Sequence, residues 1–196
     1  MVIAADDGEL FGEYGRLGHH MVLHDGLIHV PMITHGLEGV AHHSENPTQH
    51  IDIMQTLLSV AGVDTLQFQG YDIREHSREM AISQDLRGSV DDPDRESYEL
   101  IRTHNPEIDL SHLPESMATA VRTTEFKLVQ TDEWSKLYQL PDETNHVQNA
   151  YPSVFDDLKS FLHEWLTTDG TPFEDAPEET ELSEDTEQHL QDLGYM

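Results

Sequence analysis

An apolar run at residues 2–5 ends directly in the acidic sequence Asp6-Asp7-Gly8-Glu9. A second apolar run, residues 30–34, follows after a stretch rich in glycine and histidine. Short apolar runs bounded by turn residues are typical of strands buried on both faces. Apolar residues then recur at helical spacing over residues 51–61, and Gly62 is placed to end that helix. Strand, loop, strand and helix in this order indicate the α/β class.

The second half of the chain has a different pattern. Residues 71–115 are polar with weak periodicity, which predicts loops with at most one short strand or helix. Three short apolar runs joined by turn residues then predict an antiparallel meander, at residues 120–122, 126–129 and 136–140. After Pro152 the apolar residues between 155 and 166 share one helical face, which predicts an amphipathic helix.

The charge of the chain limits its partners. Lys and Arg number 10 against 39 Asp and Glu, so the formal net charge is −29. Such a surface repels nucleic acid phosphates and anionic membranes, and it repels itself until salt screens it. We therefore predict a salt-adapted protein. A partly disordered acidic protein is the alternative, but the apolar periodicities are too regular for it. Residues 169–196 hold ten acids and no Lys or Arg, which predicts a solvated acidic tail.

The absence of cysteine removes several kinds of site. With no cysteine, this chain can hold no disulfide, no thiolate zinc site and no cysteine nucleophile. The chain contains no run of about 18 apolar residues, so no transmembrane helix is predicted. The first residues lack the basic and long apolar regions of a secretory signal.

The acidic sequence after the first strand is a candidate metal site. In open α/β sheets, ligands bind just beyond the carboxyl ends of strands. Adjacent carboxylates such as Asp6 and Asp7 repel each other unless a cation lies between them, and Ca²⁺ or Mg²⁺ prefers carboxylate oxygens. Gly8 allows the backbone to turn sharply there. The alternative is an ordinary surface loop of an acidic protein.

Histidines cluster in the following stretch, GHHMVLHDGLIHVPMITHG. Imidazoles bind transition metals when neutral and pair with anionic esters when protonated. His20 and His24 are four residues apart, so a separate zinc site on a helix is an alternative. The pair His42-His43 is more simply explained as surface.

Five segments occur in order along the chain. They are DDGELFGEYGRLGHH, HDGLIHVPMI, HIDIMQTLLSVAGVD with Gln69-Gly70, RTTEFKLVQ followed by KLYQLPDETNHVQN, and the closing LQDLGYM. Together they resemble the C-terminal half of a sulfatase of the alkaline phosphatase superfamily, of a halophilic archaeal type. The resemblance implies the C-terminal part of an alkaline-phosphatase-like α/β/α sandwich, plus a small antiparallel sheet packed on a C-terminal helix. The expected domains are residues 1–115, residues 116–168 and an acidic tail at 169–196.

The resemblance also implies site residues. Asp6 matches the metal-ligating aspartate, and Asp7 lies where the family has His or Asn as the next metal or ester contact. The implied metal is calcium, with magnesium as the alternative. His20 lies where the family has a sulfate-binding Lys, and His29 where it has an Arg, so these are the expected catalytic residues. Asp52 matches the helix motif, where it is expected to cap or position the helix.

The family's nucleophile, a formylglycine made from Cys or Ser, lies in an N-terminal half that this sequence does not match. The resemblance therefore implies hydrolysis of a small-molecule or carbohydrate sulfate ester by the complete enzyme, and an inactive chain by itself. A separately encoded N-terminal half is an expected partner. The alternatives are a phosphoester or phosphonate hydrolase of the same superfamily, and a non-catalytic acidic binding fragment.

Overall fold

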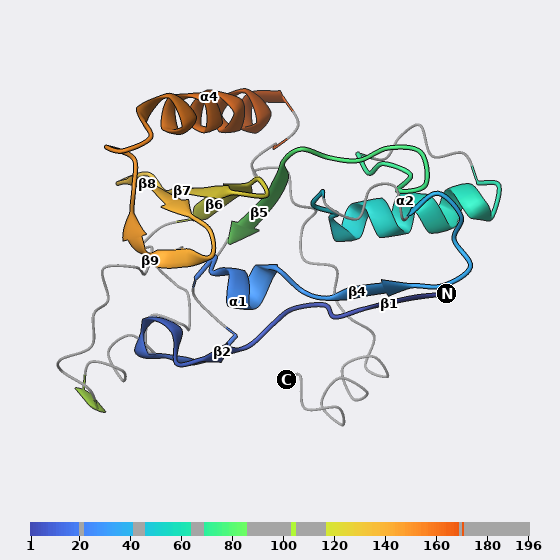
Figure 1. Ribbon diagram of the computed structural model, residues 1–196, viewed down its shortest axis with the longest axis horizontal. Coiled ribbons are helices and arrows are strands. Elements are labelled where there is room, and N and C mark those ends of the chain that lie inside the picture. The colour runs from blue at the N-terminus through green and yellow to red at the C-terminus, as the bar shows by residue number, and fades with distance from the viewer. Residues whose placement is uncertain are drawn as a thin grey trace, which may run out of the picture. The chain divides into compact units, whose positions relative to one another are not determined.

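The computed structural model describes residues 1–19, 22–40, 46–63, 69–85, 103–104, 117–168 and 170. The chain divides into two compact units, Met1–Lys159 and Ser160–Met196. Helix α4 (Pro152–Thr168) contains the boundary between them. All other described strands and helices belong to the first unit (Figure 1).

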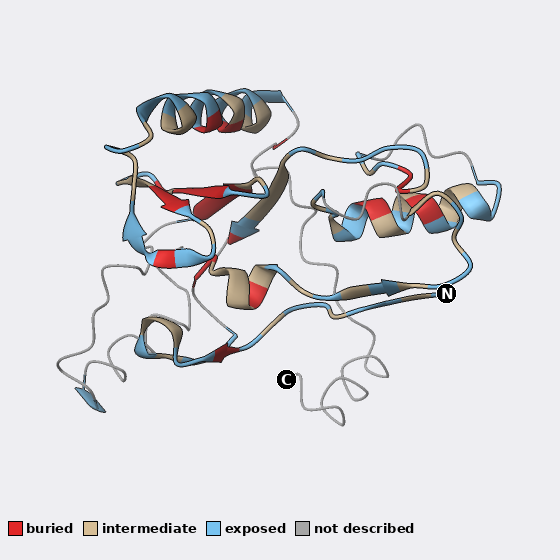
Figure 2. Cartoon of the chain, in the orientation of Figure 1, coloured by how far each residue is buried: buried red, intermediate tan, exposed pale blue. Residues whose placement is uncertain are grey.

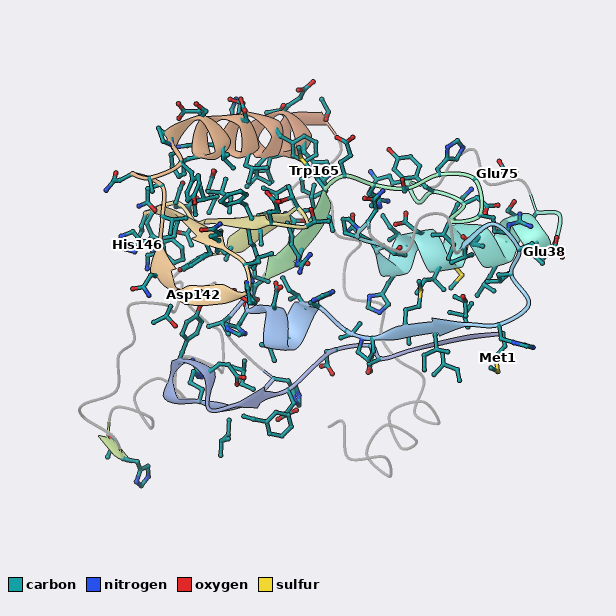
Figure 3. All side chains as sticks on the ribbon, in the orientation of Figure 1. Met1, Glu38, Glu75, Asp142, His146 and Trp165 are labelled. Carbon is teal, nitrogen blue, oxygen red and sulfur yellow. The ribbon has the colours of Figure 1, made fainter. Side chains whose placement is uncertain are left out.

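The largest element of the first unit is a five-stranded antiparallel sheet in the order β5-β6-β7-β8-β9. Its strands are β5 (Ala81–Asp85), β6 (Ala118–Arg122), β7 (Phe126–Gln130), β8 (Ser135–Gln139) and β9 (Asp142–His146). The predicted meander is confirmed as β6, β7 and β8. Strand β5 lies in the stretch expected to be mostly loop, and β9, whose ends Asp142 and His146 are labelled in Figure 3, was not predicted. Both have polar sequences, and they form strands because each pairs with an apolar neighbour.

The core lies on this sheet, where the buried residues of β6, β7 and β8 gather (Figure 2). One core cluster combines Leu23 with sheet residues from three strands, and half-buried Ile28 and Trp134 pack against it. The sheet residues of this cluster are Ala118, Ala120, Val129 and Tyr138. Its two members on β6, Ala118 and Ala120, are two residues apart, as expected for one face of a sheet.

Strands β1 (Val2–Ala4) and β4 (Met32–Thr34) form a separate antiparallel pair. Both strands were predicted, but their burial was not as expected. Ile3 and Ile33 lie opposite each other and are 53% and 59% exposed. Among the described residues the pair has no third strand, and the faces that carry Ile3 and Ile33 are largely exposed. Met1 lies at the outer end of the pair, where its amino group donates to the His35 carbonyl (Figure 3).

The Gly- and His-rich stretch expected to be mostly loop contains short regular elements. Strands β2 (Leu10–Phe11) and β3 (Leu17–Gly18) pair around the 3-10 turn Glu13–Gly15, and α1 (Asp25–Ile28) follows. A small core cluster of Leu10, Val22 and Leu27 holds this stretch together, with Tyr14 and Ile28 packed against it.

Helix α2 (His50–Val60) confirms the predicted helix, and Gly62 adopts the left-handed φ of +74° that ends it. Asp52 completes a capping box with Gln49, as expected. The apolar face, however, points away from the described core. Met54 is 56% exposed, whereas Asp52 and Thr56 are each 1% exposed. Polar contacts to residues 71–78 occupy the inner side of α2, which leaves its apolar side open.

Helix α4 confirms the second predicted helix, with Pro152 in its first turn as expected. Just before it, the Tyr151 ring contacts Phe126 edge to face, and its hydroxyl donates to Gln139 Oε1 at 3.2 Å. The Gly170 amide donates to the Trp165 carbonyl, near the predicted helix end. The predicted acidic tail lies outside the described residues, apart from Gly170. Within the described part, no helix is long and apolar enough to span a membrane.

A carboxylate beside α2 leads to a pH prediction. The Arg74 guanidinium donates to both oxygens of Asp72, and the Arg74 amide donates to Oδ1. These hydrogen bonds outweigh burial and hold the pKa of Asp72 well below its ordinary value. As the pH falls, Asp72 is therefore protonated in the unfolded chain, at a pH of about 3.9, before it is protonated in the folded chain. The contribution of Asp72 to stability is complete above that pH and is lost as pH falls through the folded pKa.

We expect Asp72→Asn to lower the free energy of unfolding at pH 7 and to lower it progressively less below about pH 4. Urea unfolding of both proteins at a series of pH values measures the difference. A difference that stays constant from neutral pH into the acid range would contradict the assignment.

Candidate functional site

The predicted metal-binding pair lies in a turn at the end of β1. Asp6 and Asp7 follow this strand after one residue, Ala5, and both are exposed. The turn rests on α1 through Gly8, whose amide donates to the Leu27 carbonyl at 2.9 Å. A Cβ at position 8 would lie 2.0 Å from the Gly26 carbonyl oxygen. Only glycine allows the two backbones to approach this closely.

The structure places one of the two expected catalytic histidines. His29 follows α1 and is exposed, and its Nδ1 lies 3.4 Å from Arg122 Nη2 and 3.8 Å from Asp25 Oδ2. His20, His42 and His43 lie outside the described residues. His24, the other member of the proposed zinc pair, caps α1 by accepting a hydrogen bond from the Gly26 amide at 2.9 Å.

A pocket of about 720 Å³ lies beside the acidic turn. Its walls come from the end of β1, from β4, from the first turn of α2 and from the start of β5. Ala4 and His29 both line it, but Asp6 and Asp7 do not. His50 joins the pocket to the acidic turn, because its Nε2 lies 2.8 Å from the Ala5 carbonyl oxygen.

Cationic side chains gather in this pocket although the chain as a whole is strongly acidic. Arg78 and Arg122 line it together with His29, His50 and His76. Each arginine pairs with an aspartate, Arg78 with buried Asp52 and Arg122 with Asp25. The remaining walls are largely apolar. The pocket therefore suits a ligand that has an apolar body and groups that exchange hydrogen bonds with imidazole and guanidinium.

Sequence reasoning missed four of these five residues, all except His29. The one signal that could have found the arginines is their low number. The chain has only 10 Lys and Arg against 39 Asp and Glu, so each arginine is expected to form an ion pair. No pattern along the sequence pointed to His50 or His76.

Comparisons with known proteins identify structures with a similar fold. No protein-family model matches the sequence, and no functionally curated protein does. A candidate sulfatase from Bacteroides thetaiotaomicron matches with a TM-score of 0.58 and 17% identity over 85% of this chain. A phosphonate monoester hydrolase from Silicibacter pomeroyi matches with a TM-score of 0.57 and 23% identity over 85% of this chain. The chain has the fold of the C-terminal part of sulfatase-like proteins.

A third structure, of BT4656 in complex with its substrate D-glucosamine-2-N,6-O-disulfate, matches with a TM-score of 0.58 and 18% identity. This chain spans only 33% to 35% of the length of these three proteins, although they cover 85% of it. The expected fold class is therefore confirmed. The metal ligands, the catalytic histidines, the domain boundaries and the salt adaptation stay predictions.

Among the described residues, the acidic turn offers oxygen ligands suited to a hard divalent cation, but too few to fill its coordination shell. Asp6 and Asp7 supply carboxylate oxygens, whereas Ca²⁺ takes about six to eight oxygen ligands. In the described ranges no group of three or more His, Asp or Glu side chains is placed to hold a metal ion. The acidic turn fits one part of a coordination shell.

Proposed function

We propose that this chain forms the C-terminal part of a sulfatase-type hydrolase that cleaves sulfate esters. The observation that carries the proposal is the position of Asp6-Asp7-Gly8 one residue after the end of β1, in a chain with a sulfatase-like fold. Asp6 and Asp7 would supply oxygen ligands to a divalent cation, with calcium as the first choice. His20 and His29 would contact the ester. A bound cation would neutralise ester oxygens and assist the nucleophile.

The pocket supports an anionic substrate. His29 lies on its wall beside Arg122, and His50 links the same wall to the backbone that leads into Asp6. Apolar walls and cationic side chains together suit the organic and anionic parts of an ester. The sulfated glucosamine bound by one similar protein supports a carbohydrate sulfate as one class of substrate.

The nucleophile is expected on another segment of polypeptide. The sequence contains neither a cysteine nor a Ser-x-Pro-x-Arg motif from which a formylglycine could be made. The uncovered apolar side chains of β1, β4 and α2 support contact with further polypeptide, whether it belongs to the same chain or to a separately encoded N-terminal half. They include Ile3, Ile33, Ile51, Met54, Leu57 and Val60.

A phosphonate monoester hydrolase is the second candidate function. It is favoured by one observation, the 23% identity to the Silicibacter pomeroyi enzyme. Imidazoles at positions 20 and 29 do not by themselves distinguish a sulfate from a phosphonate ester, because both anions accept hydrogen bonds. A non-catalytic acidic binding fragment is the third candidate, and metal binding at the acidic turn separates it from the other two.

We expect the 196-residue chain to bind Ca²⁺ weakly, with water completing the coordination shell, at one saturable site that depends on the acidic turn. Calorimetric titration in molar KCl is the measurement, because salt screens diffuse binding to the acidic surface. Asp6→Asn combined with Asp7→Asn should abolish this site. The matched control is Asp156→Asn with Asp157→Asn, which removes an equally charged, exposed pair from α4. Identical titrations for all three proteins would refute the proposed metal site.

We also expect no ester hydrolysis by the 196-residue chain alone. Release of nitrophenol from 4-nitrophenyl sulfate and from a 4-nitrophenyl phosphonate ester, in molar KCl with Ca²⁺, measures this. A rate above the buffer blank that survives repeated purification would show that the chain holds its own nucleophile, contrary to the proposal.

A further inference from the structure

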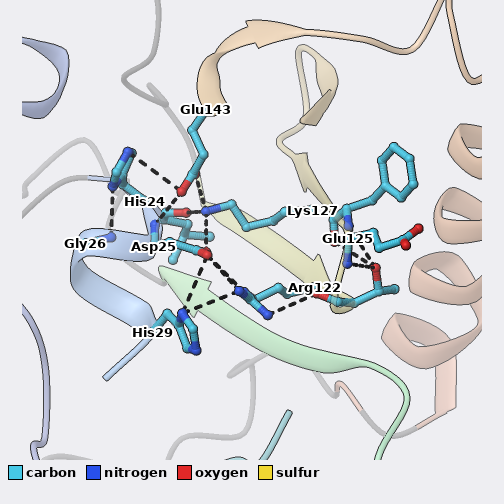
Figure 4. A network of polar contacts seen from close by, with 11 residues as sticks. His24, Asp25, Gly26, His29, Arg122, Glu125, Lys127 and Glu143 are labelled. Carbon is cyan, nitrogen blue, oxygen red and sulfur yellow. Dashed lines mark hydrogen bonds and ion pairs between the residues drawn. The ribbon is translucent and has the colours of Figure 1, made fainter. Parts of the chain in front are cut away.

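Two cations lie side by side in the centre of the five-stranded sheet. Arg122 of β6 and Lys127 of β7 are register partners across an antiparallel pair. Like charges in this arrangement destabilise a sheet unless an anion lies between them. Asp25 supplies that anion, since its Oδ1 accepts from Lys127 Nζ at 3.0 Å and its Oδ2 accepts from Arg122 Nε at 3.0 Å (Figure 4).

Lys127 is fully buried and has three partners. Its Nζ donates to the Leu23 carbonyl at 2.8 Å, and it forms ion pairs with Asp25 and with Glu143 of β9 (Figure 4). Two of these contacts are hydrogen bonds, to Leu23 and Asp25, and the contact with Glu143 Oε2 is an ion pair without hydrogen-bond geometry. We call Asp25, Arg122, Lys127 and Glu143 the charge cluster; it contains two cations and two anions and is balanced.

The charge cluster holds α1 in place. The Asp25 amide, at the first residue of α1, donates to Glu143 Oε1 at 2.8 Å. Helix α1 has only four residues, too few to be stable by propensity. Its position therefore depends on these contacts and on Ile28, which packs against both core clusters.

Helix α1 in turn supports the acidic turn. Gly8 donates to the Leu27 carbonyl at 2.9 Å, and its Cα lies so close to Gly26 that no Cβ would fit. Asp7 is the residue directly before Gly8. A displacement of α1 would therefore move or release the segment that carries Asp6 and Asp7.

We infer that Lys127 and Arg122 are positioning residues, which hold the Asp6-Asp7 turn in place through Asp25, α1 and Gly8. This inference rests on the proposed function in one respect, because the proposed function assigns a bound cation to the Asp6-Asp7 turn. It adds a specific role for the small sheet, which is to hold the acidic turn in place through α1.

The test compares two variants of the 196-residue chain with matched stability. Lys127→Met with Glu143→Gln removes one cation and one anion of the charge cluster. Leu128→Ala, at the next residue of β7, removes a fully buried side chain from the opposite face of the sheet. Both variants are expected to unfold at a lower temperature than the wild type. Measurements are made well below either midpoint.

Two readouts separate positioning from general destabilisation. The first is hydrogen exchange of the Gly8 amide, which should be faster in the Lys127→Met/Glu143→Gln variant and unchanged in Leu128→Ala. The second is the Ca²⁺ dissociation constant, which should rise about tenfold or more in the first variant, as for lost outer contacts of a metal site. Leu128→Ala should leave this constant within about twofold of wild type.

Each outcome decides one question. Unchanged Gly8 exchange in the double variant overturns the inference. If the wild type binds Ca²⁺ through Asp6 and Asp7, an equal Ca²⁺ dissociation constant in the double variant also overturns it. If the wild type binds no Ca²⁺ there, the proposed metal site fails, while Gly8 exchange still decides whether the charge cluster positions the turn. Should the double variant not fold, Arg122→Gln, which leaves Lys127 and Glu143 paired, is expected to change both readouts in the same direction by a smaller factor.

Discussion

Replacing Asp52 by alanine is expected to lower the free energy of unfolding by about 3–5 kcal/mol. The carboxylate is 1% exposed, and it pairs with the Arg78 guanidinium through both oxygens. It also accepts from the Gln49 amide at 2.9 Å and from the Tyr71 amide at 2.8 Å. Alanine would leave the Arg78 guanidinium and two backbone amides without this partner. The Gln49 amide lies at the start of α2, and the Tyr71 amide lies in the segment packed on α2.

Urea unfolding in molar KCl, followed by tryptophan fluorescence, measures this loss. Asp157→Ala, which removes an exposed carboxylate from α4, is the matched control and should change the free energy by no more than about 0.5 kcal/mol. Asp52→Ala combined with Arg78→Met should cost less than Asp52→Ala alone, because no unpaired guanidinium remains. A loss for Asp52→Ala as small as that of the control would mean that the pair is not formed in solution.

The single substitution Lys127→Met is the second change expected to have a large effect, again about 3–5 kcal/mol. Methionine fills a similar volume, so the loss comes from charge rather than from a cavity. Glu143 is 3% exposed and would lose its cation. Asp25 would keep only Arg122. The Lys127 and Arg122 charges and hydrogen bonds now outweigh burial and keep the pKa of Asp25 below its ordinary value.

A double-mutant cycle identifies the cause. Adding Glu143→Gln to Lys127→Met should restore part of the lost stability, because the second substitution removes the unpaired buried anion. The same unfolding measurement applies to all four proteins of the cycle. If the two losses simply add, Lys127 and Glu143 do not interact, and the charge cluster is not formed as described.

Local patterns along the chain predicted several elements correctly. The apolar runs that became β6, β7 and β8, the helical spacing within α2 and α4, and the glycine after α2 are all confirmed. These elements depend on interactions between residues close in sequence, and such interactions leave a periodic pattern. The capping role of Asp52 was expected from the family resemblance, and the capping box with Gln49, three positions earlier, confirms it.

Other elements depend on neighbours far along the chain. Polar β5 and β9 are strands because β6 and β8 pair with them. The four-residue helix α1 exists because residues more than 90 positions away hold Asp25. The apolar face of α2 predicted burial, yet the polar face is the buried one, since Arg78 and Tyr71 offer Asp52 better partners than water does. No period along the sequence encodes such contacts.

The candidate site divides in the same way. The sequence by itself determined that acidic residues follow a strand, that a glycine follows them, and that cations are scarce enough for each to matter. Only the tertiary structure decided which cation meets which acid, that α1 lies beneath Gly8, and that two arginines line the pocket next to the acidic turn. The physical reason is that charge pairing and close backbone approach depend on distance in space, whereas a sequence records only order along the chain.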